Sequence, residues 1–206
     1  MKILALDTAQ WVTSIALWED GKELAFEEVV QERDQAALLP ILVHNVLRDH
    51  SIDLILVNRG PGSFTGIRLG LAFARGLSLG LGIPVKGIDG FTALYQSLKT
   101  PDPVLILLDA HRQDVFGQLF QNGAAHPPQN YTRKDIQALL QDNPSFLVAE
   151  HGVETFLKGL SFQKTLPLHQ ASRALAYAFF KDQSLAEPAL PLYIREADVT
   201  VSTKFC

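Results

Sequence analysis

Apolar residues follow two different periods along the chain, and this predicts a mixed α/β fold. Continuous apolar runs are typical of buried strands, whereas apolar residues three or four positions apart are typical of helices. The stretch TSIALWEDGKELAFEEVV predicts two strands joined by a tight turn at Asp20-Gly21. The expected elements of the first half are strands at 3–6 and within 13–30, a helix at 34–48, a strand at 54–57, a helix at 66–81 and a strand at 83–86.

The second half begins with the same pattern as the first. VLILLDAHRQDVFGQLFQNG can be aligned without a gap on KILALDTAQWVTSIALWEDG, so that Asp109 aligns with Asp7 and Gly123 with Gly21. We therefore predict a duplicated βββαβα unit in two lobes, residues 1–100 and 101–206, with a short second lobe. The alternative, two unrelated hairpins that share a common pattern, stays open. The further elements expected are helices near 133–140, 154–160 and 171–181 and a strand at 145–149.

Composition narrows the class of protein. A hydrophobic fraction of 47% is typical of an ordinary globular chain. With a net charge of −4, the chain has no excess of positive charge with which it could bind nucleic acid by itself. Any tRNA would therefore be held indirectly, through another protein. The single cysteine, Cys206, excludes an internal disulfide and fits a cytoplasmic location. Arg68 and Arg75 interrupt the longest apolar region, so we expect no membrane span.

A glycine-rich segment, residues 58–66, joins the fourth predicted strand to the following helix. It lacks the Lys and Ser or Thr of a phosphate-binding P-loop, and it follows the wrong strand for a dinucleotide fingerprint. Amides at the helix start, with Ser63 and Thr65 as caps, could receive an anion, although capping alone explains the same residues. The candidate anion or nucleotide site consists of Asp7, Thr8, Gly60, Gly62, Ser63, Thr65, Gly66 and Asp109.

Small residues form two stripes along the helix at 66–81. Gly66, Gly70 and Ala74 lie on one stripe, and Arg68, Ala72, Gly76 and Gly80 lie on the other. A glycine inside a helix costs about 1 kcal/mol relative to alanine, so close approach of a neighbour is the usual compensation. That neighbour is either another part of this chain or another subunit. The candidate docking residues are Leu38, Leu42, Gly66, Arg68, Gly70, Ala74, Arg75 and Gly76.

Other chemistry is sparse. Asp7 and Asp109 end corresponding strands and could face a shared cleft that handles magnesium or phosphate, although strand-end aspartates are more often turn residues. No two histidines have the spacing of a helical zinc pair, and we predict no metal site. Ser63 lacks the Gly-x-Ser-x-Gly context of a hydrolase nucleophile.

Four segments together resemble the bacterial TsaB family, also called YeaZ. The segments are ILALDTA, NRGPGSFTGIRLGLAFARGLSLGLGIPVKGI, LDAHRQDVF and PLYIREADV. The resemblance implies the two-lobed (ASKHA) fold of actin, sugar kinases and Hsp70. It also implies a role in forming N6-threonylcarbamoyladenosine at position 37 of tRNAs.

In that family's pathway the paralogue TsaD transfers the threonylcarbamoyl group and binds a metal through a His-x-x-x-His pair. The corresponding residues here are Gly90 and Leu94, which cannot bind a metal, so the resemblance implies a non-catalytic subunit. The resemblance also implies that the subunit pairs with a TsaD-like transferase through the helices at 35–48 and 66–81, and a homodimer could use the same helices. The resemblance further implies a TsaE-like ATPase bound through the complex, and ATP or ADP at the partner interface but not on this chain alone.

Two departures and two rival functions accompany this resemblance. Glu32-Arg33-Asp34 stands where members of the TsaB family commonly have an Arg-Glu-His-like stretch, and His111 stands where arginine is frequent in that family.

The first rival function is a stand-alone ATPase or sugar kinase with the actin-like fold, favoured by Asp7 and Asp109. The second is a dinucleotide-binding oxidoreductase, favoured only by the glycine spacing.

Overall fold

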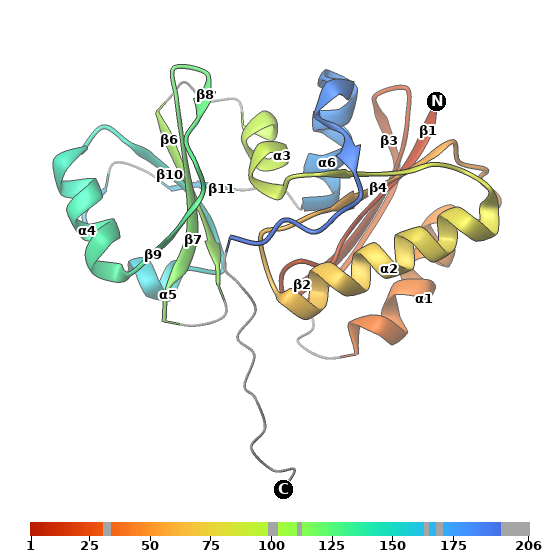
Figure 1. Ribbon diagram of the computed structural model, residues 1–206, viewed down its shortest axis with the longest axis horizontal. Helices are drawn as coiled ribbons and strands as arrows, with labels where there is room; N and C mark the ends of the chain where they lie inside the picture. Colours follow the sequence, from red (N-terminus) through yellow and green to blue (C-terminus); the bar gives the residue numbers. More distant parts are fainter. Residues whose placement is uncertain (31–33, 99–102, 111–112, 163–164, 168–170, 195–206) are drawn as a thin grey trace, which may run out of the picture.

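The computed structural model describes residues 1–30, 34–98, 103–110, 113–162, 165–167 and 171–194. Two six-stranded sheets lie side by side in this part of the chain (Figure 1). The first sheet has the order β12 (Glu187–Pro188), β5 (Val85–Ile88), β4 (Leu54–Asn58), β1 (Lys2–Asp7), β2 (Val12–Glu19) and β3 (Lys22–Val30). The second has the order β11 (Thr165–Pro167), β10 (Leu147–His151), β6 (Val104–Asp109), β7 (Val115–Gln121) and β8 (Ala124–Ala125), with β9 (Gln129–Tyr131) also paired to β7.

Helices cover both sheets and separate them, as Figure 1 shows. Helices α1 (Gln35–Leu47) and α2 (Phe64–Leu81) cover the outer face of the first sheet, and α4 (Arg133–Asp142) and α5 (Glu154–Leu157) cover that of the second. Helices α3 (Gly90–Ser97) and α6 (Ala171–Lys181) lie between the sheets. The hydrophobic cluster there includes Ile3 of the first sheet, Phe116 of the second and Phe91 of α3, so one core joins both.

The two sheets are built to the same plan. In each, a central strand, β1 or β6, pairs antiparallel with the next strand and parallel with a strand that follows a helix. The hairpin turns also correspond, with positive φ at Asp20 and Gly21 (48° and 81°) and at Asn122 and Gly123 (55° and 73°). The pairing register of the two hairpins differs by one position: Asp7 pairs with Ser14, but Asp109 pairs with Val115 rather than with Phe116, which aligns with Ser14. The connection after Asp109 is therefore one residue shorter.

Several predicted elements differ from those observed. The strands at 83–86 and 145–149 are shifted by two residues to β5 and β10, and the helix at 154–160 ends at Leu157. Helix α3 was not expected at all, because eight residues beginning with glycine carry little periodic signal. Asp89 starts this helix by accepting hydrogen bonds from the amides of Phe91 and Thr92. The short strands β9, β11 and β12 were likewise not predicted.

The chain returns to the first sheet after it has formed the second. Helix α6 packs on α3, β1 and β2, and β12 pairs with the edge strand β5. Residues 187–194, which we call the strap, then run beside α2 (Figure 1). The division into lobes at residues 1–100 and 101–206 stays a prediction.

Some predictions concern residues that the structure does not describe. Glu32, Arg33, His111 and Cys206 lie outside the described residues, as does most of the segment PLYIREADV. Among the helices that the structure does describe, none is long and apolar enough to span a membrane.

Candidate functional site

The glycine segment lies against the end of β1. A Cβ atom at Gly66 would lie 2.0 Å from the carbonyl oxygen of Thr8, and one at Gly62 would lie 2.1 Å from that of Ala9. The Ser63 amide donates to the Ala9 carbonyl (2.7 Å), and the Thr8 hydroxyl donates to the Gly66 carbonyl (2.7 Å). These glycines therefore permit close contact between the start of α2 and the end of β1.

Hydrogen bonds within the protein also account for other amides of this segment. The Gly60 amide donates to Oδ1 of Asn58 (2.8 Å), and the Gly66 amide donates to Oγ of Ser63 (3.2 Å). Ser63 is thus the N-cap of α2, whereas Thr65 lies exposed in the first turn. Anion binding by this segment stays a prediction, and packing within the chain is sufficient to explain the glycines.

Asp7 is buried at the carboxyl end of β1, with 1% of its surface exposed. Its Oδ1 accepts a hydrogen bond from the Ala9 amide (2.6 Å), and its Oδ2 accepts one from Nδ2 of Asn58 (2.9 Å). Asn58 ends the parallel neighbour β4, so the strand pairing itself brings the two side chains together. Burial raises the pKa of Asp7, and the two hydrogen bonds and the charge of His151 oppose this shift.

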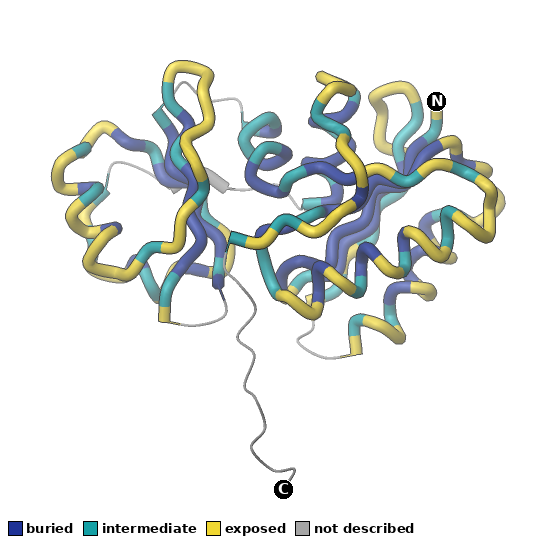
Figure 2. The backbone as a smooth tube through the Cα atoms, in the orientation of Figure 1, coloured by how far each residue is buried: buried dark blue, intermediate teal, exposed yellow. Residues whose placement is uncertain are grey.

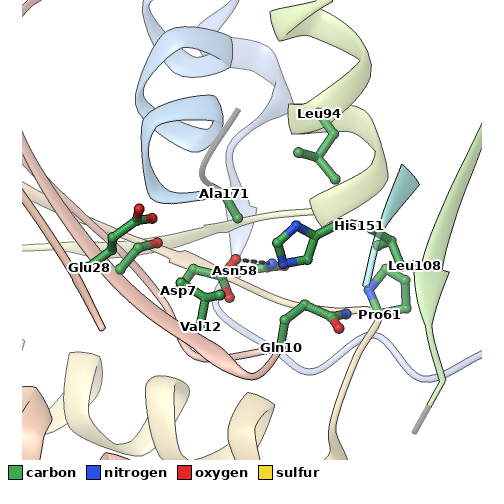
Figure 3. A pocket seen from close by; sticks show the side chains of 11 residues that line it. Asp7, Gln10, Val12, Glu28, Asn58, Pro61, Leu94, Leu108, His151 and Ala171 are labelled. Carbon is green, nitrogen blue, oxygen red and sulfur yellow. Dashed lines mark hydrogen bonds between the residues drawn. The ribbon is translucent and has the colours of Figure 1, made fainter. Parts of the chain in front are cut away.

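A small cavity lies between the two sheets beside Asp7 (Figure 3). Its volume is about 40 Å³. The side chains around it come from both halves of the chain, and Figure 3 shows Asp7, Gln10 and His151 around one space. The lining residues are Asp7, Gln10, Val12, Ser14, Glu28, Asn58, Pro61, Leu94, Leu108, His151 and Ala171.

Asp109 does not join Asp7 in this cavity. It lines a different, more open cavity with Arg133, Lys158 and other residues of the second half, and its Oδ2 accepts a hydrogen bond from Nε1 of Trp11 (3.1 Å). The shared cleft expected for the two aspartates is therefore not formed by the described residues.

The two stripes of α2 face opposite surroundings. Gly66, Gly70 and Ala74 are buried, and a Cβ atom at Gly70 would lie 2.5 Å from Oγ1 of Thr8. At Gly76 and Gly80, in contrast, a Cβ atom would meet nothing within 4 Å. The first stripe thus packs inside the chain, and the second stripe faces outward (Figure 2).

The other candidate docking residues are also divided. On α1, Leu42 is buried, Leu38 is half-buried, and Ile41, which the sequence analysis did not select, is 55% exposed. Arg68 and Arg75 are exposed but bind the strap of their own chain: Arg68 Nε donates to the Tyr193 hydroxyl (3.0 Å), and Arg75 donates to the Ala189 carbonyl. Their main observed contacts are therefore internal.

Known proteins of similar sequence share one name. Over 137 residues the chain is 35% identical to the Escherichia coli tRNA threonylcarbamoyladenosine biosynthesis protein TsaB, an alignment that covers 61% of this chain and 59% of that protein. The Haemophilus influenzae protein of the same name is 34% identical over 56% of this chain and 52% of its own length. The chain is similar to members of the TsaB (YeaZ) family. It spans only part of the length of these relatives.

Other matches agree with this family. A YeaZ structure from Pseudomonas aeruginosa superposes with a TM-score of 0.73 at 23% identity, covering 93% of this chain and 99% of that one. The model of the TsaD family, tRNA N6-adenosine threonylcarbamoyltransferase, matches residues 32–128. Structures of the ethanolamine utilization protein EutJ and of a ROK family glucokinase give TM-scores of 0.56 and 0.52. The fold is therefore the two-lobed actin-like fold that the family resemblance implied.

Two positions of α3 bear on the predicted absence of a metal site. Gly90 and Leu94, which the sequence analysis predicted to correspond to the histidine pair of TsaD, are both buried on this helix. Their side chains offer no atom that could coordinate a metal. Across the described residues, no group of three or more His, Cys, Asp and Glu side chains could hold a metal ion.

Sequence reasoning missed Asn58, Gln10 and His151. Asn58 could have been found, because the carboxyl ends of neighbouring parallel strands meet at one edge of a sheet. Gln10 and His151 could not, since they come together only when the two halves of the chain pack.

Proposed function

We propose that this chain is a non-catalytic partner subunit of a TsaD-like transferase in the formation of N6-threonylcarbamoyladenosine on tRNA. The names of its TsaB relatives support the pathway. The observation that carries the proposal is the outward face of α2. There Gly76 and Gly80 leave the helix backbone open, and Leu79 is 85% exposed. Small residues beside an exposed leucine allow a helix of another subunit to approach closely.

The absence of a catalytic role is supported by the residues of α3. The resemblance to TsaD places the metal ligands of the transferase at Gly90 and Leu94 of this helix, and neither side chain can bind a metal. A stand-alone ATPase or sugar kinase is less well supported. The cavity beside Asp7 offers about 40 Å³, whereas pockets for drug-sized ligands run to roughly 300–1,000 Å³.

The remaining partners follow from the same proposal. A TsaE-like ATPase and the tRNA bind through the complex, and ATP or ADP binds only at the interface with the transferase. A net charge of −4 supports indirect tRNA contact, because the chain has no excess of cations for the phosphate backbone. The expected location is the cytoplasm, where the tRNA is modified. A homodimer through α1 and α2 would compete with the transferase for the same face.

Replacing Gly76 tests the docking face without damaging the fold. We expect Gly76→Gln to weaken binding of a TsaD-like transferase at least tenfold in titration calorimetry, because the side chain fills the open stripe. Glutamine is the better helix former, so the free energy of unfolding should not fall. The matched control is Ala138→Gln on the exposed side of α4, which should leave the affinity unchanged. Equal affinities for wild type and Gly76→Gln would contradict the proposed face.

Measuring the mass of the free chain separates the homodimer from the transferase complex. If Gly76→Gln disrupts a homodimer but leaves transferase binding intact, the exposed stripe serves self-association and the proposed docking face is wrong. If the variant loses transferase binding, the proposal holds whether or not the free chain dimerises.

A further inference from the structure

Arg68 carries a guanidinium that two aromatic rings hold on the surface. Its Cζ lies 3.6 Å from the centroid of the Phe64 ring and 5.9 Å from that of the Tyr193 ring. Its Nε donates a hydrogen bond to the Tyr193 hydroxyl (3.0 Å), and the centroids of the two rings lie 5.1 Å apart. We call Phe64, Arg68 and Tyr193 the arginine cluster. It joins the start of α2 to the strap.

The guanidinium of Arg68 has hydrogen-bonding capacity that the described residues do not use. An arginine carries five N–H donors, and the hydrogen bond to Tyr193 uses only the one on Nε. No carboxylate of the described residues forms an ion pair with Arg68. The residue is exposed. The N–H groups on Nη1 and Nη2 are therefore available to an acceptor outside the described part of the chain.

The arginine cluster has the properties of a site that is organised before its partner arrives. A surface arginine normally moves among many rotamers, and fixing it costs side-chain entropy. The ring contacts have already restricted Arg68, so a partner that binds it loses less freedom. Phe64 and Tyr193 are 36% and 38% exposed, so part of each ring is also open to contact. Tyrosine and arginine are among the residues that contribute most to binding at protein interfaces.

The arginine cluster is continuous with the open part of α2. Arg68 belongs to the outward stripe that also contains Gly76 and Gly80. With a rise of 1.5 Å per residue, Arg68 lies roughly 12 Å, or about two turns, from Gly76 along the helix. The strap, which carries Tyr193, runs beside α2 (Figure 1). A helix of another subunit that lies along this stripe therefore reaches the arginine cluster as well.

We propose that the arginine cluster binds a carboxylate of the docking partner, an Asp or Glu side chain of the TsaD-like transferase. This inference rests on the proposed function and names the group that the outward face of α2 recognises. A carboxylate fits the planar guanidinium, because its two oxygens accept two parallel N–H bonds. A phosphate of tRNA fits the same donors, but the net charge of −4 disfavours the approach of nucleic acid to this chain.

Reversing the charge at position 68 tests the carboxylate site. We expect Arg68→Glu to weaken binding of a TsaD-like transferase at least tenfold in titration calorimetry, because two carboxylates would then face each other. The matched control is Lys134→Glu on the exposed side of α4, which changes the net charge equally and should leave the affinity unchanged. Equal affinities of the wild type and Arg68→Glu would overturn the proposal.

Salt dependence distinguishes the charge of Arg68 from its packing on the rings. Arg68→Gln keeps an N–H donor and part of the side-chain stem but removes the charge. Between about 0.05 and 0.5 M salt, the affinity of the wild type should fall more steeply than that of Arg68→Gln, because salt screens an ion pair at the surface. The same slope for both proteins would show that Arg68 acts only through its packing, and that result contradicts a carboxylate partner.

The combined outcomes separate this inference from the proposed function. If Gly76→Gln weakens transferase binding and Arg68→Glu does not, the docking face holds and the carboxylate site is wrong. If neither variant changes the affinity, both are wrong. If Arg68→Glu weakens binding only when tRNA is present, the bound anion is a phosphate, and the proposal is overturned.

Carbodiimide cross-linking identifies the carboxylate directly. Arg68→Lys places a primary amine at this position, and a water-soluble carbodiimide joins that amine to a carboxylate in contact. The new amide bond forms with loss of water, which the carbodiimide takes up as it becomes a urea. Mass spectrometry should find a link from position 68 to an Asp or Glu of the transferase, about two turns from the residue that contacts Gly76. Links to its own chain alone would contradict the proposal.

Discussion

Gly66→Ala should lower the free energy of unfolding by about 3 kcal/mol, although it adds only one methyl group to α2. The added Cβ would lie 2.0 Å from the Thr8 carbonyl oxygen, so either the start of α2 or the end of β1 must move. Such a movement also stretches the 2.7 Å hydrogen bond from the Thr8 hydroxyl to the Gly66 carbonyl. Urea-induced unfolding followed by circular dichroism measures the change.

The same helix supplies a control of opposite sign. Gly76→Ala should raise the free energy of unfolding by about 1 kcal/mol, because this exposed glycine has nothing within 4 Å of its missing Cβ and alanine is the better helix former. If both substitutions stabilised the protein, the close packing of Gly66 against β1 would be wrong. If both destabilised it, the outward stripe of α2 would be covered by something in the free protein.

Phe91→Ala should have a comparably large effect, about 3–5 kcal/mol, because it empties the centre of the core between the two sheets. Phe91 has no exposed surface and lies on α3, which separates the sheets. Since one hydrophobic cluster contains side chains of both sheets, the loss should affect the whole protein rather than one lobe. Urea unfolding monitored by tryptophan fluorescence and by circular dichroism gives two independent measures.

Phe64→Ala is the matched control for this prediction. Phe64 is 36% exposed at the start of α2 and contacts Tyr193 and Arg68 of the surface, so its removal should cost less than half as much. In Phe91→Ala, the two probes should still report one transition. Two separate transitions, with only one of them shifted, would contradict a core that is continuous between the sheets.

Most strands and helices of the first half could be predicted, because their residues carry a strong local pattern. The buried run at β1 and the Asp20-Gly21 turn each identify an element without tertiary information. Helix α3 could not be predicted, because its start depends on one Asp89 cap and its length on burial between the sheets. The strand β12 exists only because Glu187 and Pro188 meet the edge of β5, far away in sequence.

The candidate site was predictable only in part for the same reason. A side chain has no room at Gly66 and Gly70, but it has open space at Gly76 and Gly80, and the sequence could not tell which stripe of α2 faces the protein. Gly70 was a candidate docking residue for which packing within the chain was the alternative, and in this structure it meets Thr8 of its own chain. Arg68 and Arg75 were expected on the docking face, and the strap that binds them has no local pattern that would identify it. Tertiary packing, not propensity, decides these positions.

Reconstitution with a TsaD-like transferase tests the proposed function most directly. The transferase should form N6-threonylcarbamoyladenosine on tRNA efficiently only when this chain is added, Gly76→Gln should reduce that stimulation, and Ala138→Gln should not. This chain without the transferase should form none. Formation of the modified nucleoside by this chain alone, or equal activity of the transferase with and without it, would contradict the account.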